Sequence, residues 1–365
     1  MKLTDEQLLK LIEAGLTDEQ IMQFAHENTP PADLYGATAQ VVTDILHGDP
    51  IMLETLRQNK DETGAKEALA LLERIAGEAE FEEVAEWWRG LGIGRADTKK
   101  ICMTMLYGSK EFGNRDSIQE RIDKRAEEIL EKALDPYFDR SGADIWKDYR
   151  TKAITVMVRL TRSAVAIVCP STVETMDTIQ GWAGSMGARD LPFKFRTKLG
   201  FMVIQDNPNQ ITKQIEIWEN GKRVGTLAYR EKVKEGKLMN ERKMAAGAAP
   251  NFVHSNDACH LMMATNATAQ EITNEWEGGC EGFMDDGNGG KAYFMMIHDS
   301  MATQCADTPA LARQIRQTAC EIYADSDLLF DVWGLNGGED SMLAEPEPMG
   351  DLDVTEVLNS RYFFS

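Results

Sequence analysis

Apolar residues in the first half of the chain recur at the three- and four-residue spacing of helices. Residues 1–30 contain Leu-Thr-Asp-Glu-Gln twice, and each Thr-x-x-Gln is a capping box ahead of an apolar run. Gly90, Gly92 and Gly94 interrupt the helical pattern. Their Gly-x-Gly-x-Gly spacing could suggest a phosphate-binding loop, but no strand precedes them and no Lys-Ser or Lys-Thr follows. We therefore interpret them as a turn. Helices are predicted over residues 33–46, 66–88, 117–135 and 142–166.

After residue 192 the pattern changes to the alternation typical of strands. Residues 193–204 alternate as two strands around a turn, and residues 216–229 as a hairpin whose Asn-Gly suits a type I′ turn. The small residues at 245–250 predict a loop, and residues 292–297 a strand. Because helices and strands do not follow each other as βαβ units, the predicted fold class is α+β.

Arg95, Lys99, Met103 and Tyr107 recur every four residues, so they form one stripe on a helix, roughly 18 Å long at 1.5 Å per residue. The two cations at one end could hold a triphosphate, and the tyrosine at the other end could reach a sugar or base. For any one of these residues, an ordinary amphipathic helix with a cationic face is the alternative. The combination favours a nucleotide-binding helix.

The composition limits the classes of protein that need to be considered. The 365 residues are 43% hydrophobic, which is enough for two or three subdomains. A run of about 18 apolar residues, as a membrane span needs, does not occur, and the N-terminus lacks the apolar core of a signal peptide. The six cysteines include no Cys-x-x-Cys pair, and Cys259-His260 lacks a second pair, so a reduced cytoplasm is favoured over a disulfide framework or structural zinc.

The net charge of −21 is concentrated at the two ends of the chain. Residues 1–90 carry −12 and residues 301–365 carry −9, so the middle of the chain is neutral. Basic clusters in this middle part could line a path for phosphates, although a solvated surface of mixed charge is the alternative. The clusters lie within residues 147–162, 194–198 and 222–237.

His298-Asp299-Ser300 directly follows the strand predicted at residues 292–297. A carboxylate at the end of a buried strand is costly unless it binds a metal or is paired. Taken alone, Asp299 fits a hairpin turn. Together with the stripe helix it favours transfer from a nucleoside triphosphate, which uses Mg²⁺ held by carboxylates and cations on the leaving diphosphate.

These motifs together resemble the single-subunit phage and mitochondrial RNA polymerase family. Residues 95–113 resemble its fingers helix, residues 250–255 and 297–300 its later palm motifs, and residues 33–36 the segment after its first palm strand. Residues 193–204 and the hairpin at 216–229 are placed like its promoter-specificity hairpin, and residues 356–365 resemble its closing helix and aromatic terminus. The resemblance implies the C-terminal portion of a right-hand polymerase fold, α+β and mainly helical, acting in the cytoplasm of an infected bacterial host.

The resemblance also implies which residues contact the nucleotide. Arg95 and Lys99 would hold the triphosphate, and Lys99 would be the acid for the departing diphosphate. Tyr107, followed by Gly108, would lie under the incoming base and test for the ribose 2′-hydroxyl with His254 as its partner.

The remaining implied roles concern the metal and the walls of the site. Asp299 would bind both Mg²⁺ ions, and His298 would shape the site beside it. The other residues would line the nucleotide path or pack near it: Tyr35, Met103, Phe364 and Ser365.

Two positions favour RNA synthesis over DNA synthesis. DNA polymerases of the related bacterial repair type share Arg-x-x-x-Lys and Tyr-Gly but usually carry an aromatic residue where this chain has Met103. They also end the palm motif as His-Asp-Glu, where this chain has Ser300.

One departure from the family pattern predicts a second subunit. Two metal ions need at least two carboxylates. The family's first one would precede residues 33–36 by a few dozen positions, where residues 1–30 predict capped helices without an Asp-Gly-x-x-x-Gly-like pattern. Asp285-Asp286 reads as a loop. We therefore expect the larger, C-terminal subunit of a split RNA polymerase, similar to the heterodimeric enzymes of some podophages, with a partner that brings the N-terminal domain and the missing Asp.

The predicted partners are a DNA template, an RNA product, NTPs and an accessory recruitment or single-stranded-DNA-binding protein, because an acidic chain neutralises few phosphates. The alternatives are a polymerase-derived DNA-binding or regulatory subunit without catalysis, and a fragment of a DNA polymerase of the A family.

The predicted segments are a docking element (1–30), a palm–fingers connection (31–90), fingers (91–190), a specificity-hairpin-like region (191–244), a palm with the catalytic Asp (245–345) and a C-terminal foot (346–365).

Overall fold

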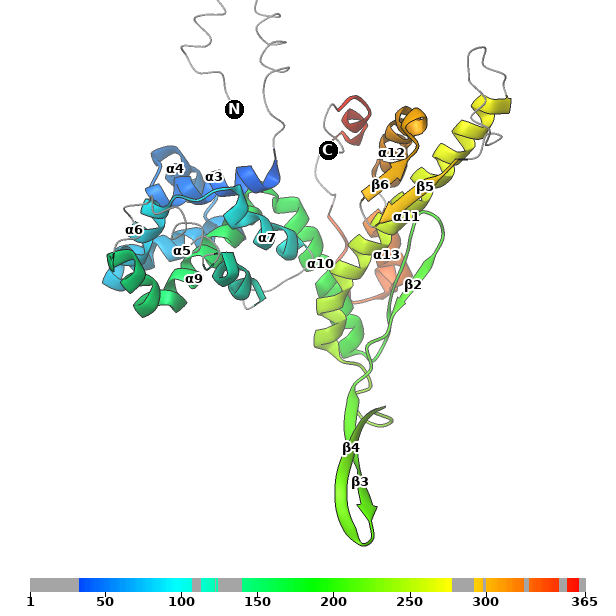
Figure 1. The fold of residues 1–365 in the computed structure, drawn as a ribbon, viewed down its shortest axis with the longest axis horizontal. Coiled ribbons are helices and arrows are strands. Elements are labelled where there is room, and N and C mark those ends of the chain that lie inside the picture. Colours follow the sequence, from blue (N-terminus) through cyan, green and yellow to red (C-terminus); the bar gives the residue numbers. More distant parts are fainter. Residues whose placement is uncertain are drawn as a thin grey trace, which may run out of the picture. The chain divides into compact units, whose positions relative to one another are not determined.

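Two sets of helices account for most of the described residues in the computed structural model (Figure 1). Contacts divide the chain into two units, Met1–Cys102 with Arg115–Val168, and Met103–Asn114 with Cys169–Ser365. The described residues are 33–106, 113–121, 123, 140–277, 292–297, 300–324, 328–347 and 353–360. The docking element predicted at residues 1–30 lies outside them.

The first unit is helical throughout its described part. Its helices are α3 (Leu34–His47), α4 (Pro50–Gln58), α5 (Thr63–Gly77), α6 (Ala79–Leu91), most of α7 (Arg95–Leu106) and α9 (Arg140–Val168). Helix α9 contacts α3, α5 and α6, and its C-terminal half supplies buried residues such as Met157 and Leu160 to their shared core. The predicted helices at 33–46, 66–88 and 142–166 are confirmed, with a non-helical residue, Tyr149, inside α9.

Local sequence signals explain where these helices begin and end. Asp33 and Asp49 are the N-caps of α3 and α4, and each side chain accepts two backbone N–H groups of the first turn. Gly48, between the two helices, has a φ of 70°, which glycine adopts without strain. The turn expected around Gly90, Gly92 and Gly94 is confirmed for two of the three glycines. Gly92 ends α6 with a φ of 68°, and α7 begins after Gly94, whereas Gly90 lies in the last turn of α6.

The second unit is built on two long helices, α10 (Pro170–Ala188) and α11 (Glu241–Glu277), which pack against each other. The loop expected at residues 245–250 is wrong, because these residues lie inside α11. Alanine is the strongest helix former, and residues this small let α10 approach closely. A Cβ on Gly187 of α10 would lie 3.1 Å from Glu241 Cα. Pro250 is tolerated within the helix.

Three antiparallel strand pairs complete the second unit. The predicted strands at 193–204 are β1 (Phe193–Arg196) and β2 (Met202–Gln205). The predicted hairpin is β3 (Gln210–Glu219) and β4 (Lys222–Lys232); Asn220 and Gly221 have φ values of 50° and 74°, as a type I′ turn requires. It projects away from α10 and α11 (Figure 1). The third pair is β5 (Phe294–Ile297) and β6 (Ser300–Thr303).

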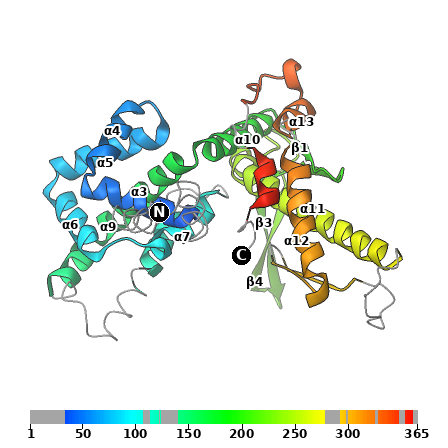
Figure 2. The ribbon, with the colours of Figure 1, turned by 90° about the horizontal axis from the view of Figure 1, so that it is seen from above.

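The C-terminal part of the chain adds α12 (Thr308–Tyr323), which packs on α11, and α13 (Leu328–Leu335), which packs on β1 (Figure 2). The helix expected in the tail is a short 3-10 segment, Val354–Asn359. Mainly helical structure with short antiparallel strands confirms the α+β class. In the described part of the chain, no single helix has the length and apolarity to cross a membrane. One bent pair of helices, Tyr149–Val168 and Pro170–Ala188, reaches that length and apolarity only when the two are taken together.

Candidate functional site

Helix α7 turns its cationic face to solvent because its other face is buried. Ile101 and Cys102 have no exposed surface and Met105 only 7%. The stripe residues Arg95, Lys99 and Met103 are exposed, Met103 by 41%. The predicted stripe is therefore confirmed over its described positions. Tyr107 and Gly108 lie outside the described residues.

Two buried polar residues fix the start of α7. The Asp97 carboxylate accepts a hydrogen bond from Gly94 N at 2.9 Å and another from Arg121 Nε at 2.9 Å. Thr98, which is fully buried, donates from Oγ1 to the Tyr35 carbonyl oxygen at 2.9 Å. The first turn of α7 is thereby tied to the first turn of α3.

The structure brings together three of the predicted site residues at this junction. The Arg95 guanidinium carbon lies 5.0 Å from the centroid of the Tyr35 ring, and Lys99 Nζ lies 5.7 Å from the same centroid. Both cations therefore lie within reach of the electron-rich face of Tyr35. A site with two adjacent cations on an aromatic support can bind a polyanion such as a triphosphate.

Asp33 also belongs to this group, although the sequence reasoning gave it no role in the site. Arg95 Nε donates to Asp33 Oδ2 at 2.8 Å, and the side chains remain 54% and 33% exposed. Burial alone would raise the pKa of Asp33, but hydrogen bonds from Arg95, Tyr35 and Gly36 and the Arg95 charge outweigh it and lower the pKa. The helix-capping position of Asp33 was the available signal; its pairing with Arg95 depends on how α3 and α7 pack.

His254, the predicted partner of the ribose, lies on α11 in the second unit and is exposed. One turn before it, Asn251 Nδ2 donates to Gln205 Oε1 at 2.9 Å, and Gln205 Nε2 donates to the Met244 carbonyl oxygen at 2.6 Å. The buried Gln205 thus ties the end of β2 to the part of α11 that carries His254.

The predicted metal ligand Asp299 lies outside the described residues, as do His298, Phe364 and Ser365. The strands on either side of residues 298–299 are paired, with Ile297 opposite Ser300. The expected burial of this strand is wrong for one of its faces. Met296 packs towards Leu311 and Ile315, whereas Met295 and Ile297 are 64% and 59% exposed.

The described residues do not form a magnesium site by themselves. Among them no three His, Cys, Asp or Glu side chains are grouped as a metal would require. The carboxylates of Asp285, Asp286 and Asp299 lie outside the described part.

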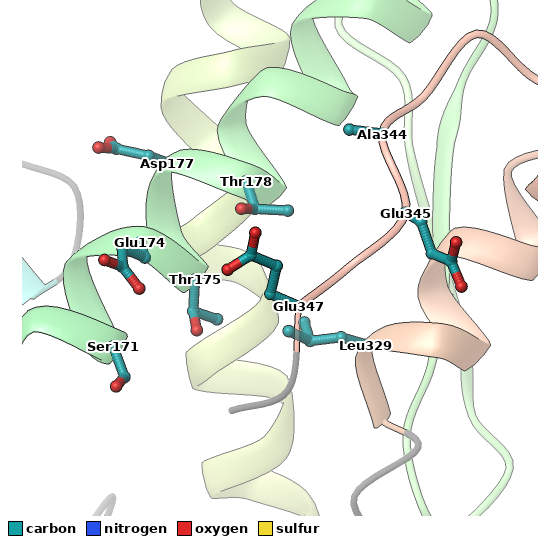
Figure 3. A pocket seen from close by; sticks show the side chains of 9 residues that line it. All are labelled: Ser171, Glu174, Thr175, Asp177, Thr178, Leu329, Ala344, Glu345 and Glu347. Atoms are coloured by element: carbon teal, nitrogen blue, oxygen red, sulfur yellow. The ribbon is translucent and has the colours of Figure 1, made fainter. Parts of the chain in front are cut away.

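A separate pocket of the second unit does not suit a nucleotide. It has a volume of about 460 Å³ and lies between α10 and residues 344–347 (Figure 3). Four carboxylates line it, those of Glu174, Asp177, Glu345 and Glu347, and none of the described residues that line it is a cation. Because like charges repel, a triphosphate is better accommodated at α7.

Comparisons with known proteins agree with the expected family. A family model described as DNA-dependent RNA polymerase matches residues 23–333. The DNA-directed RNA polymerase of Enterobacteria phage T3 is 26% identical, over 91% of this chain and 36% of that protein. T7 RNA polymerase of Escherichia phage T7 is 27% identical over the same shares, and the DNA-directed RNA polymerase of Pseudomonas phage phiKMV is 26% identical over 79% of this chain and 30% of its own length. The chain thus spans about a third of the length of these relatives.

Proposed function

The chain belongs to the DNA-dependent RNA polymerase family, and from this premise we propose that it provides the nucleotide-binding part of an enzyme that makes RNA from NTPs on a DNA template. The observation that carries this proposal is the convergence of Arg95, Lys99 and Tyr35 where α3 meets α7. Arginine and lysine there can neutralise the charge that develops on a leaving diphosphate.

The two cations suit different tasks in this proposal. Arg95 presents a planar fork that can bind phosphate oxygens in pairs, whereas Lys99 has a compact ammonium group that can give up a proton. Lys99 would protonate the departing diphosphate, and Arg95 would hold the triphosphate in place. Met103, Tyr107, Gly108 and His254 would contact the base and ribose.

Asp299 is the proposed metal ligand, with His298 beside it and Phe364 near the active site. The activity would need Mg²⁺ and a second carboxylate. We propose that a partner subunit supplies that carboxylate together with the N-terminal domain. In support, the exposed Met295 and Ile297 beside residues 298–299 leave an apolar face that another segment can cover.

An activity assay tests the proposal. The chain is co-expressed with the reading frames next to its own and assayed for Mg²⁺-dependent NTP incorporation on primed template. We expect activity with the partner and a loss of roughly 100-fold or more in Asp299→Ala, because the site would lose its charge clamp. Asp206→Ala, an exposed aspartate on no proposed contact, is the matched control.

The outcomes separate the possible functions. Full activity in Asp299→Ala would refute the site. A preference for dNTPs would indicate a DNA polymerase fragment, and DNA binding without incorporation by any combination would indicate a regulatory subunit. If only a single longer polypeptide is active, the second carboxylate would come from the same chain and not from a separate partner.

A further inference from the structure

We propose that Asp33 is a positioning residue for Arg95 that presents the guanidinium to the triphosphate; this inference rests on the triphosphate role of Arg95 proposed above. Asp33 is placed to do so because it contacts both the backbone of α3 and the side chain of Arg95.

The Asp33 carboxylate is itself held in place by the start of α3. Oδ1 accepts from Tyr35 N at 3.0 Å, and Oδ2 accepts from Gly36 N at 3.3 Å. Gly36 leaves room for this approach, since a Cβ there would lie 3.1 Å from Oδ2. A carboxylate fixed by two backbone donors is a rigid acceptor, unlike one on a free surface side chain.

The contact with Arg95 uses one edge of the guanidinium. Oδ2 accepts from Nε at 2.8 Å, which is one of the five N–H donors of an arginine. The two terminal amino groups form the fork that binds phosphate oxygens in pairs. The Tyr35 ring supports the guanidinium, and 54% of the Arg95 side chain is exposed. Asp33 and Tyr35 thus orient the group before a phosphate arrives.

Asp33 also brings a negative charge near the proposed triphosphate position, which opposes binding. Two features offset that charge. The carboxylate lies at the N-terminus of α3, where the helix dipole is positive, and it is paired with Arg95. Because the group is partly exposed, water and salt screen the remaining repulsion. We therefore expect positioning to outweigh the repulsion that remains.

The inference is tested with Asp33→Ala in the full chain. We expect the Kd of the chain for tripolyphosphate, measured by calorimetry, and the KM of the active complex for NTP each to rise roughly 3- to 10-fold, as when one long side chain is no longer pre-ordered. The kcat should change less than the KM. Asp33→Asn keeps an acceptor oxygen and should recover part of the loss.

Two controls separate positioning from loss of a helix cap. Asp49→Ala removes the same kind of cap from α4, where Asp49 accepts from Ile51 N and Met52 N at 3.0 and 2.9 Å. It should leave tripolyphosphate binding unchanged. In an Arg95→Ala background, Asp33→Ala should have little further effect, because Asp33 acts through Arg95.

Equal effects of Asp33→Ala and Asp49→Ala, or full additivity with Arg95→Ala, would overturn the inference. A thermal melt of each variant identifies any that has lost its fold. If Asp33→Ala has lost its fold, the tripolyphosphate affinity of Asp33→Asn decides whether the inference holds. If the wild-type complex incorporates no NTP, the proposed function fails, whereas tripolyphosphate binding to the full chain still decides the role of Asp33.

Discussion

At the scale of single residues, a few buried or half-buried carboxylates decide how helices meet. Asp97 joins the start of α7 to Arg121, and Glu271 joins α11 to α12. Glu271 accepts from Arg313 Nε at 3.1 Å and from Gln314 Nε2 at 2.6 Å, and its side chain is 19% exposed. Such bonds between a charge and its donors stabilise more than neutral ones.

Glu271→Gln should lower the free energy of unfolding by about 1 kcal/mol at pH 7, because a charged acceptor of two donors becomes neutral. Burial alone would raise the pKa of Glu271, but the hydrogen bonds from Arg313 and Gln314 and the Arg313 charge lower it. The contribution is therefore present above the unfolded pKa of about 4.3 and is lost as pH falls through the lower folded value. Urea unfolding of both proteins between pH 3 and 7 measures this.

Glu241→Gln, in the exposed ion pair with Lys237 at the other end of α11, is the matched control and should change little. A difference between wild type and Glu271→Gln that persists unchanged at the lowest pH would contradict the assigned cause.

At the scale of elements, close packing of helices depends on glycines that look unremarkable in the sequence. Gly64 on α5 lies against α9, where a Cβ would be 2.9 Å from both Ala166 Cβ and the Ser163 carbonyl oxygen. Backbone cannot move aside as a flexible side chain does. This glycine therefore sets how closely α5 and α9 approach.

Gly64→Ala should destabilise the protein by about 1–3 kcal/mol through overpacking. Gly77→Ala, at the other end of the same helix, is the matched control: nothing lies within 4 Å of its Cβ position, and alanine is the better helix former. Thermal melts followed by circular dichroism measure both. A Gly64→Ala protein as stable as Gly77→Ala would show that the contact can relax.

At the scale of the whole molecule, net charge opposes binding to nucleic acid. The chain carries −21, and two cations of the β3–β4 hairpin are paired with carboxylates, Lys213 with Glu231 and Arg223 with Glu216. Paired cations release fewer counterions from DNA than free ones. Weak binding of the chain to DNA is the reason to propose an accessory protein that recruits it to the template.

The isolated chain should bind random duplex DNA no more tightly than about 1 μM at physiological salt. Fluorescence anisotropy across a salt series measures the affinity and its slope. Substituting both carboxylates, Glu216→Gln with Glu231→Gln, should tighten binding and steepen the slope, because two hairpin cations lose their partners. Tight, salt-resistant binding by the wild-type chain would contradict the argument.

The sequence by itself determined the local elements and the cationic face of α7. Helix periodicity, the Asp33 cap, the Gly92 stop and the Asn220-Gly221 turn depend on neighbours in the chain, so α3, α6, α7 and the hairpin could be predicted. The four-residue spacing of Arg95, Lys99 and Met103 likewise placed them on one exposed stripe.

Only the tertiary structure decided how distant segments meet. The small residues at 245–250 are typical of a loop, but they lie in α11 and let it pack closely against α10. A local sequence pattern does not show that contact. The exposure of Met295 and Ile297 depends on what covers β5, and the pairing of Asp33 with Arg95 on the Tyr35 ring joins residues 62 positions apart. Local bonding sets an element, whereas long-range packing sets the partner of each side chain.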